Sequence, residues 1–175
     1  MLKNFKKNNK QENLVYDSIL LLSRNKLFYT NFNLSDTFQN RIHLIFIHIS
    51  FLFLKIKQNN NIKYKIFYQN IFDLIFKRIE LNMREIGYGD TRINKNMKIL
   101  VKNFYNILLY CENFSRKNLF SNNVFFLKYL ESKKKKMANN EDINRYFIKY
   151  QAFCIDLRPE SVLKEGLNFN YNQNK

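Results

Sequence analysis

The sequence predicts an all-α protein, folded as a single compact domain of about six helices. Only three glycines and one proline interrupt the 175 residues, so long continuous elements are expected. Hydrophobic residues make up 46% of the chain and include 18 phenylalanines, which is ample material for a packed core. In the long segments the apolar residues recur every three or four positions, which is the period of a helix.

The chain is expected to begin with a flexible basic segment, residues 1–12. The first helix then covers residues 13–25, where apolar residues recur at helical spacing and Asn13 is the expected N-cap. A bend over residues 27–33 leads to the second helix.

The second expected helix begins at a cap from Ser35 or Asp36 and reaches about Lys57. One face should point into the core and carries Phe38, Ile42, Ile45, Ile49, Leu52 and Ile56. A second apolar row lies on another face and consists of Leu44, Ile47, Phe51 and Leu54. A helix that is apolar on two sides is either central in the fold or offers a surface to a partner. We expect the second row to be such a surface.

The third expected helix follows a polar linker and runs from about Tyr64 to Ile86. Its apolar stripe is formed by Tyr68, Phe72, Ile75, Ile79, Met83 and Ile86. Its polar face carries two oppositely charged pairs at i,i+4 spacing, Asp73 with Lys77 and Glu80 with Arg84.

A sharp corner is expected after the third helix. Gly87 fits the left-handed position that commonly ends helices, and Asp90 can begin the next element. Arg84 and Glu85 precede this corner, where they either hold it by pairing with neighbours such as Asp90 or form part of a partner-binding surface. The glycines at 87 and 89 follow a helix and lack the Lys-Ser/Thr of a phosphate-binding loop, so a helix–turn–helix connection explains them better.

The fourth expected helix covers about residues 93–111 and turns an apolar stripe inward. Its other side carries a basic stripe, formed by Arg92, Lys95, Lys98 and Lys102. Two shorter helices are expected over residues 118–131 and 141–155, separated by the lysine run 133–136. The helical domain should end near residue 165, and the Asn-rich residues 166–175 are expected to be a disordered tail.

The inventory of reactive residues argues against an enzyme, a metal centre or a cofactor. The only histidines, His43 and His48, are five residues apart on one helix and point roughly 140° from each other, so they do not form a chelating pair. The two cysteines, Cys111 and Cys154, lack metal-ligand spacing and are expected to be core residues of a protein in a reducing compartment.

The formal net charge of +16 indicates binding to nucleic acid, a ribosome or an anionic membrane surface, although an AT-rich genome would enrich lysine in the same way. The most apolar stretch, residues 44–54, is shorter than the roughly 20 residues that span a bilayer. The N-terminus lacks the apolar run of a secretory signal, so the chain is expected to act where it is made.

Three blocks of the sequence, taken in order, resemble a known family. The first block is Leu27-Phe28-Tyr29, then residues 36–41 (DTFQNR) and 44–48 (LIFIH). The second is residues 71–76 (IFDLIF), continuing to 83–90 (MREIGYGD), and the third is residues 95–105, which end in Phe-Tyr. The blocks are similar to conserved stretches of the ubiquinol–cytochrome c chaperones, and the resemblance covers about residues 16–108.

The resemblance implies a helical chaperone that binds newly made cytochrome b and helps to assemble the ubiquinol–cytochrome c reductase. It further implies a small helical partner protein, docking at the ribosome or an anionic membrane surface, and no small-molecule substrate. The location would be the cytoplasm at the inner membrane of a bacterium, or the matrix side of the inner membrane in a mitochondrion. The matched motif positions are Asp36, Arg41, His48, Asp73, Arg84, Glu85, Gly87, Gly89 and Asp90.

The sequence therefore leaves two alternative functions open. In the first, the protein is an assembly chaperone that holds an apolar client on the row formed by Leu44, Ile47, Phe51 and Leu54. In the second, it is a basic RNA- or ribosome-binding helical module with no dedicated client, and its binding depends steeply on salt.

Overall fold

The computed structural model describes residues 9–59, 61–133, 141–158, 160–162 and 166–171. The regular structure of these residues is helical, which confirms the all-α class. An isolated β-bridge joins Leu34 to Ser132. The helices of the described residues are α1 (Asn9–Ser23), α2 (Lys26–Thr30), α3 (Phe38–Lys57), α4 (Ile62–Glu85), α5 (Asp90–Glu112), α6 (Leu119–Tyr129) and α7 (Glu141–Asp156).

The short helix α2 occupies most of the segment that was expected to be a bend. It forms because the side chain of Asn25 accepts a hydrogen bond from the backbone N–H of Leu27, at 3.0 Å, and so caps the turn. Phe28 then buries its ring completely and packs edge-on against Tyr146 of α7, with ring centroids 4.8 Å apart. The cap and the buried ring together stabilise a helical turn in this segment.

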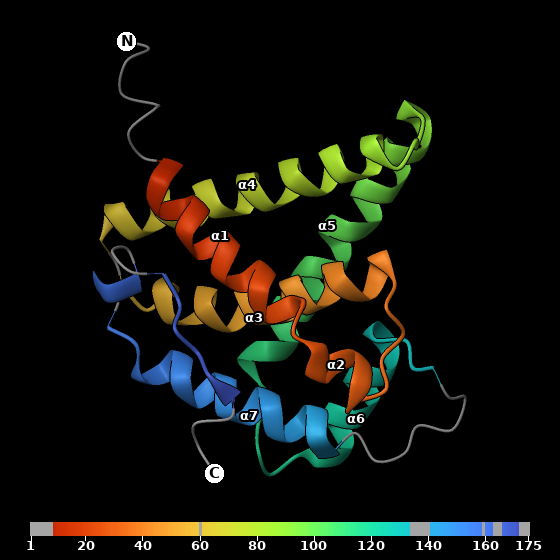
Figure 1. The fold of residues 1–175 in the computed structure, drawn as a ribbon. Helices are drawn as coiled ribbons and strands as arrows, with labels where there is room; N and C mark the ends of the chain where they lie inside the picture. Colours follow the sequence, from red (N-terminus) through yellow and green to blue (C-terminus); the bar gives the residue numbers. More distant parts are fainter. Residues whose placement is uncertain (1–8, 60, 134–140, 159, 163–165, 172–175) are drawn as a thin grey trace.

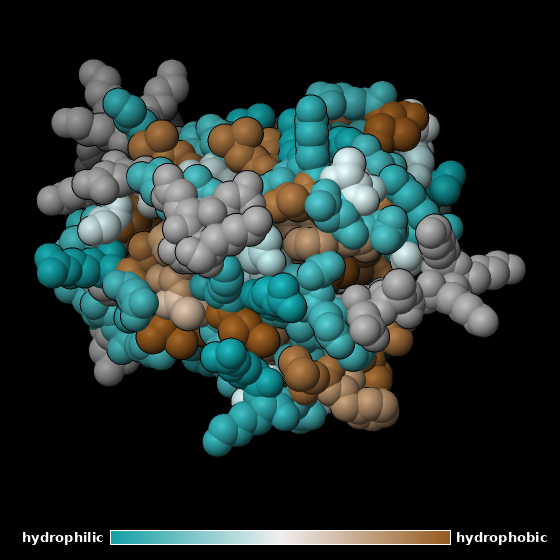
Figure 2. Space-filling model, turned by 60° about the horizontal axis from the view of Figure 1, so that its bottom comes forward, coloured by the Kyte–Doolittle hydropathy of each residue, from teal (hydrophilic) through white to brown (hydrophobic). Residues whose placement is uncertain are grey.

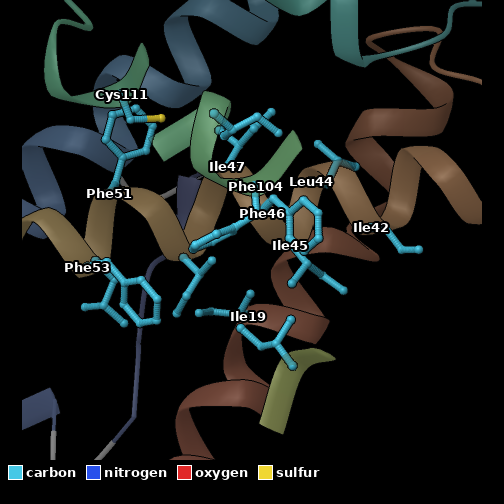
Figure 3. Close-up of a cluster of buried hydrophobic side chains, with 14 of the residues drawn as sticks. Ile19, Ile42, Leu44, Ile45, Phe46, Ile47, Phe51, Phe53, Phe104 and Cys111 are labelled. Carbon is cyan, nitrogen blue, oxygen red and sulfur yellow. The ribbon is translucent and has the colours of Figure 1, made fainter. Parts of the chain in front are cut away.

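Helix α3 is the central element of the fold. It contacts α1, α4, α5 and α7, and 14 of its 20 residues are buried, so neighbours cover it on nearly every side. Figure 1 shows α3 running through the middle of the molecule, with α1 and α4 on one side and α7 on the other. Aromatic rings fill the space between α3 and α5, where Phe46 meets Phe104 edge-on at 5.4 Å (Figure 3).

The expectation that the second apolar row of α3 is exposed is wrong. Leu44 is fully buried, and Ile47 and Phe51 are 1% and 3% exposed, while Leu54 is half-buried. The ring of Phe51 packs against Phe114 at 5.2 Å. Of the two explanations for a helix that is apolar on two sides, the central position is the correct one.

The expected N-caps of the first two helices are also wrong. α1 begins at Asn9, so Asn13 lies inside the helix. α3 is capped by Thr37, whose hydroxyl accepts a hydrogen bond from the backbone N–H of Asn40 at 3.2 Å. Thr37 can do so because its backbone is extended, whereas Asp36 directs its carboxylate to Arg41.

The apolar stripe expected on α4 is largely buried, but its last member is not. Ile75, Ile79 and Met83 lie in the core, whereas Ile86 follows the end of the helix and is 57% exposed. Of the two expected charge pairs, Glu80 with Arg84 forms. Asp73 instead accepts a hydrogen bond from Gln69, at 2.8 Å.

Both ends of the described chain pack against the helices. At the start, residues 9–12 form the first turn of α1. At the other end, residues 166–171 lie against α7, where Phe169 contacts Tyr146 and Tyr150 with centroids 5.5 and 5.1 Å apart. Residues 1–8 and 172–175, where the flexible segment and the tail were also expected, lie outside the described residues, as do residues 134–136 of the lysine run.

The corner between α4 and α5 depends on Gly87, which has a φ of +93°. The backbone N–H of Tyr88 donates to the carbonyl of Met83 at 3.0 Å and that of Gly87 to the carbonyl of Arg84 at 2.9 Å, which is the Schellman arrangement. The expectation that Gly87 adopts the left-handed conformation is confirmed.

Replacing Gly87 by alanine is expected to lower the free energy of unfolding by about 1–2 kcal/mol, because an L-residue is strained in the left-handed region. A Cβ atom at this position meets nothing within 4 Å, so the loss would come from the backbone alone. Urea denaturation measures it. Gly89→Ser is the matched control, since Gly89 has a φ of −73° at the N-cap of α5, where serine is favoured. Equal losses in the two variants would contradict the argument.

Candidate partner-binding surface

The motif residues around the α4–α5 corner hold that corner together. The guanidinium of Arg84 donates to Glu80 one turn earlier, at 2.9 Å, and to Asp90 across the corner, at 2.6 Å. Glu85 is the exposed last residue of α4, and Gly89 is the N-cap of α5. The ion pairs of Arg84 and the left-handed Gly87 thus join the end of α4 to the start of α5.

Asp36 and Arg41 form an ion pair that joins the preceding chain to the first turns of α3. The guanidinium forms two hydrogen bonds with the carboxylate, at 2.7 and 2.9 Å, in the fork geometry that arginine favours. The hydrogen bond from Arg41 holds the pKa of the Asp36 carboxyl below its ordinary value. Because the pair is well exposed, we assign it to positioning the chain before α3 rather than to stability.

His48 lies in the core and is fully buried. Its Nδ1–H donates to the carbonyl of Leu44, at 2.6 Å, and its Nε2 accepts from the hydroxyl of Tyr146, at 2.9 Å. Burial lowers the pKa of His48 to about 4, so the ring is neutral at physiological pH. These contacts make His48 a hydrogen-bonded link between α3 and α7.

His43 is also buried, on another side of α3. Its Nδ1 lies 2.5 Å from the carbonyl oxygen of Tyr129, at the end of α6, and its Nε2 lies 2.8 Å from the amide nitrogen of Gln39. Burial lowers the pKa of His43. The two histidines therefore bind different elements and share no site.

The cysteines lie in environments that disfavour nucleophilic chemistry. Both are buried and free, and burial raises the pKa of the Cys154 thiol to about 12 and that of Cys111 further. A thiol that keeps its proton at neutral pH is a poor nucleophile and a poor metal ligand. Among the described residues, no group of three or more His, Cys, Asp or Glu side chains has the arrangement of a metal site.

An apolar surface is present on α5 and α6, away from the row that the sequence suggested. On α5 it consists of Tyr105 and Leu109, and on α6 of Phe120, Val124 and Leu127, all more than half exposed. Phe120 is 82% exposed, which is unusual for so large an apolar side chain. We call these five residues the α5–α6 surface. Apolar side chains reach the solvent among hydrophilic ones in Figure 2 as well, which views the molecule from below.

A groove of about 450 Å³ lies between the two helices at this surface. Leu109, Val124 and Phe125 line it, with Lys128 also contributing to the lining. Its wall includes Tyr110 and Phe125, whose rings stack 4.0 Å apart and within 5° of parallel. Because Phe125 is buried and its ring packs directly on that of Tyr110, this wall of the groove is already formed in the folded chain.

A second groove of about 450 Å³ lies where α3, α5 and α7 end, and the buried Phe51 and the half-buried Leu54 form part of its lining. Charged groups surround it: the ammonium of Lys57 pairs with Glu112 at 3.2 Å, and that of Lys55 bonds to the carbonyl of Ile155. An apolar client would have to cover these groups. The α5–α6 surface is therefore the better candidate.

The basic stripe leads directly into the α5–α6 surface. Arg92, Lys95, Lys98 and Lys102 are all exposed on α5. Lys98, Lys102, Tyr105 and Leu109 follow one another at spacings of four, three and four residues, so they share one face of the helix. One continuous strip thus changes from cationic to apolar along α5.

Residues 30–114 match the family model described as ubiquinol-cytochrome C chaperone. This part of the chain belongs to the ubiquinol-cytochrome C chaperone family. The match confirms the resemblance of the sequence blocks from residue 36 onward, whereas residues 27–29 of the first block precede it. The matched residues contain α3, α4, α5 and the corner between α4 and α5. The match excludes α6, so three of the five residues of the α5–α6 surface lie outside the matched residues.

The fold described above also occurs in a solved structure. The crystal structure of the Cbp3 homolog from Brucella abortus superposes with a TM-score of 0.76 at 22% sequence identity, covering 96% of this chain and 93% of that one. At this identity the likeness establishes the fold. A search of curated protein sequences finds no match. Within the described residues, no helix is long and apolar enough to cross a membrane.

The sequence contained a pattern that predicts the α5–α6 surface. In α6, Phe120, Val124 and Leu127 recur at spacings of four and three, while the opposite face carries the buried Phe125 and Phe126. A short helix that is apolar on both faces but lies at the edge of a fold leaves one of them uncovered. Helix α3 is also apolar on two faces, but both of them are covered. The sequence alone does not separate α6 from α3, because the position of α6 at the edge of the fold is known only from the structure.

Proposed function

We propose that this protein is an assembly chaperone for cytochrome b and the ubiquinol–cytochrome c reductase, and that it holds an apolar client segment on the α5–α6 surface. The family match supports the assembly role. The observation that carries the location is the five exposed apolar side chains beside a preformed groove. An apolar segment that has left the ribosome but has not yet reached its partners would cover them.

The energetics suit transient holding. Fully burying an exposed leucine or phenylalanine contributes roughly 1.5–3 kcal/mol, so covering several of the five side chains gives useful affinity. Since association also costs translational and rotational freedom, the net affinity stays moderate. A client held in this way can be released to the growing complex.

The basic stripe would bind the chaperone to the ribosome or to an anionic membrane surface. Ribosomal RNA and anionic lipid head groups both present phosphate, which lysine and arginine attract as point charges. Because the stripe continues into the α5–α6 surface, the protein would meet a nascent apolar segment where it emerges, at the cytoplasmic or matrix face of the inner membrane. A small helical partner protein would complete the assembly.

The proposal is tested by complementation of a strain that lacks the protein. Phe120→Ser combined with Val124→Ser is expected to reduce the level of assembled ubiquinol–cytochrome c reductase severely while leaving the thermal melting point unchanged, because both side chains are exposed. Leu21→Ser, at a 72% exposed position on α1, is the matched control and should restore assembly fully.

The alternative is a basic module that binds RNA without a client. It predicts that the double serine variant assembles the reductase normally, whereas Lys98→Glu with Lys102→Glu abolishes assembly. That pair of results would reject the client surface and assign the function to the charge.

A further inference from the structure

Glu12 is a buried acidic residue with an unsatisfied oxygen. It lies in the first turn of α1, where that helix packs on α4, and it is 4% exposed. Its Oε1 accepts a hydrogen bond from the amide of Asn70, at 2.9 Å. No described residue donates a hydrogen bond to Oε2. A buried carboxyl oxygen without a donor is costly, so a donor that entered this place would be bound favourably.

Two hollows flank Glu12, and Glu12 and Asn70 line both. One of about 250 Å³ is bordered by Ile62 and Ile66, which are 67% and 49% exposed. The other, of about 200 Å³, is bordered by Asp73 and Lys77. The cleft therefore combines the carboxyl groups of Glu12 and Asp73 with the ammonium groups of Lys63 and Lys77 and an apolar rim.

We propose that this cleft binds a cationic side chain of a partner protein, an arginine or a lysine. The N–H groups of that side chain pair with the carboxyl of Glu12, and its methylene stem packs against Ile62 and Ile66. Oε2 is enclosed by neighbouring atoms, so the carboxyl turns toward the entering group. This turn is easy because the terminal torsion of a glutamate is broad.

In this proposal Asp73 helps to attract the cationic side chain. Asp73 is one of the matched motif positions. It does not form the expected pair with Lys77 but accepts a hydrogen bond from Gln69. It lines the same hollow as Glu12. A second carboxylate strengthens the attraction for a cation. The cleft lies between α1 and α4, on the side of the molecule opposite α6 (Figure 1), so it is separate from the α5–α6 surface and does not depend on it.

The test uses two small probes of equal shape, butylguanidinium and the uncharged butylurea. Binding is followed by the backbone amide shifts of the full chain in two-dimensional ¹H–¹⁵N NMR spectra. Butylguanidinium should cause saturable shifts confined to the residues around Glu12 and Asn70, with millimolar affinity. Glu12→Gln should weaken its binding by about tenfold or more, since a charge-assisted hydrogen bond is lost. Butylurea should bind no better to the native protein than butylguanidinium binds to that variant.

Two variants keep the test decisive. Asp73→Asn alters an exposed side chain, so it retains the fold and should weaken butylguanidinium binding severalfold even if Glu12→Gln proves unstable. Asp17→Asn, an exposed acid on the same helix, should bind like the native protein. No saturable shift, equal binding of both probes, or a response to Mg²⁺ alone at these amides would overturn the proposal.

Discussion

Replacing Ile47 by alanine is expected to lower the free energy of unfolding by about 2–5 kcal/mol. Ile47 is 1% exposed and lies between α3 and its neighbours, in the row that the sequence suggested as a client surface (Figure 3). Truncation removes buried methyl groups and leaves a cavity, because the surrounding helices relax only partly. Urea denaturation followed by circular dichroism measures the loss.

The matched control is Val124→Ala, at a 51% exposed position of α6. Its effect on stability should stay within about 0.5 kcal/mol, as for most surface substitutions. The two variants separate the two surfaces, since one damages the core and the other the proposed client contact. A stable Ile47→Ala protein would mean that the packing around α3 is wrong and that the original row is accessible.

The stability of the protein is expected to fall in mild acid because of His48. Its pKa is about 4 in the folded chain and about 6.5 when exposed, so the unfolded chain binds the extra proton between these values. The contribution of the neutral ring is therefore fully present above about pH 6.5 and is lost as the pH falls toward 4. It amounts to about 3 kcal/mol, since each pKa unit corresponds to about 1.4 kcal/mol.

Urea denaturation at a series of pH values between 7.5 and 4 tests this, with two variants. His48→Leu should reduce the pH dependence but also leave the buried hydroxyl of Tyr146 without its partner, at a cost of about 1–3 kcal/mol. Adding Tyr146→Phe should recover most of that loss. A smaller slope remains in both variants, because the pKa of His43 is also lowered. An unchanged slope in both would show that His48 is not the titrating group.

Much of the fold was predictable from the sequence because helical spacing and end signals are local. The stripes of α4 and α5, the left-handed Gly87 and the pairing of Arg84 with Asp90 all follow from short-range patterns. The caps were less certain, because several residues compete for each position. At the start of α3, the sequence offers Ser35, Asp36 and Thr37 in succession, and only the backbone conformation selects Thr37.

The candidate surface was not predictable in the same way. Sequence spacing shows that a face is apolar but does not show what covers it. The second row of α3 is covered by rings from distant segments, such as Phe114 and Phe147, whereas the equally apolar outer face of α6 is left open. The buried acid Glu12 is another such case, since its burial depends on α4, some 58 residues away in the chain.

The most direct test of the central claim is photo-crosslinking in living cells. A photoreactive amino acid placed at Leu109 or Leu127, on the α5–α6 surface, should crosslink to cytochrome b, as identified by mass spectrometry. The same amino acid at Leu21, on α1, should not. Crosslinks to cytochrome b from Leu21 but not from the α5–α6 surface, or to ribosomal proteins alone, would contradict the account.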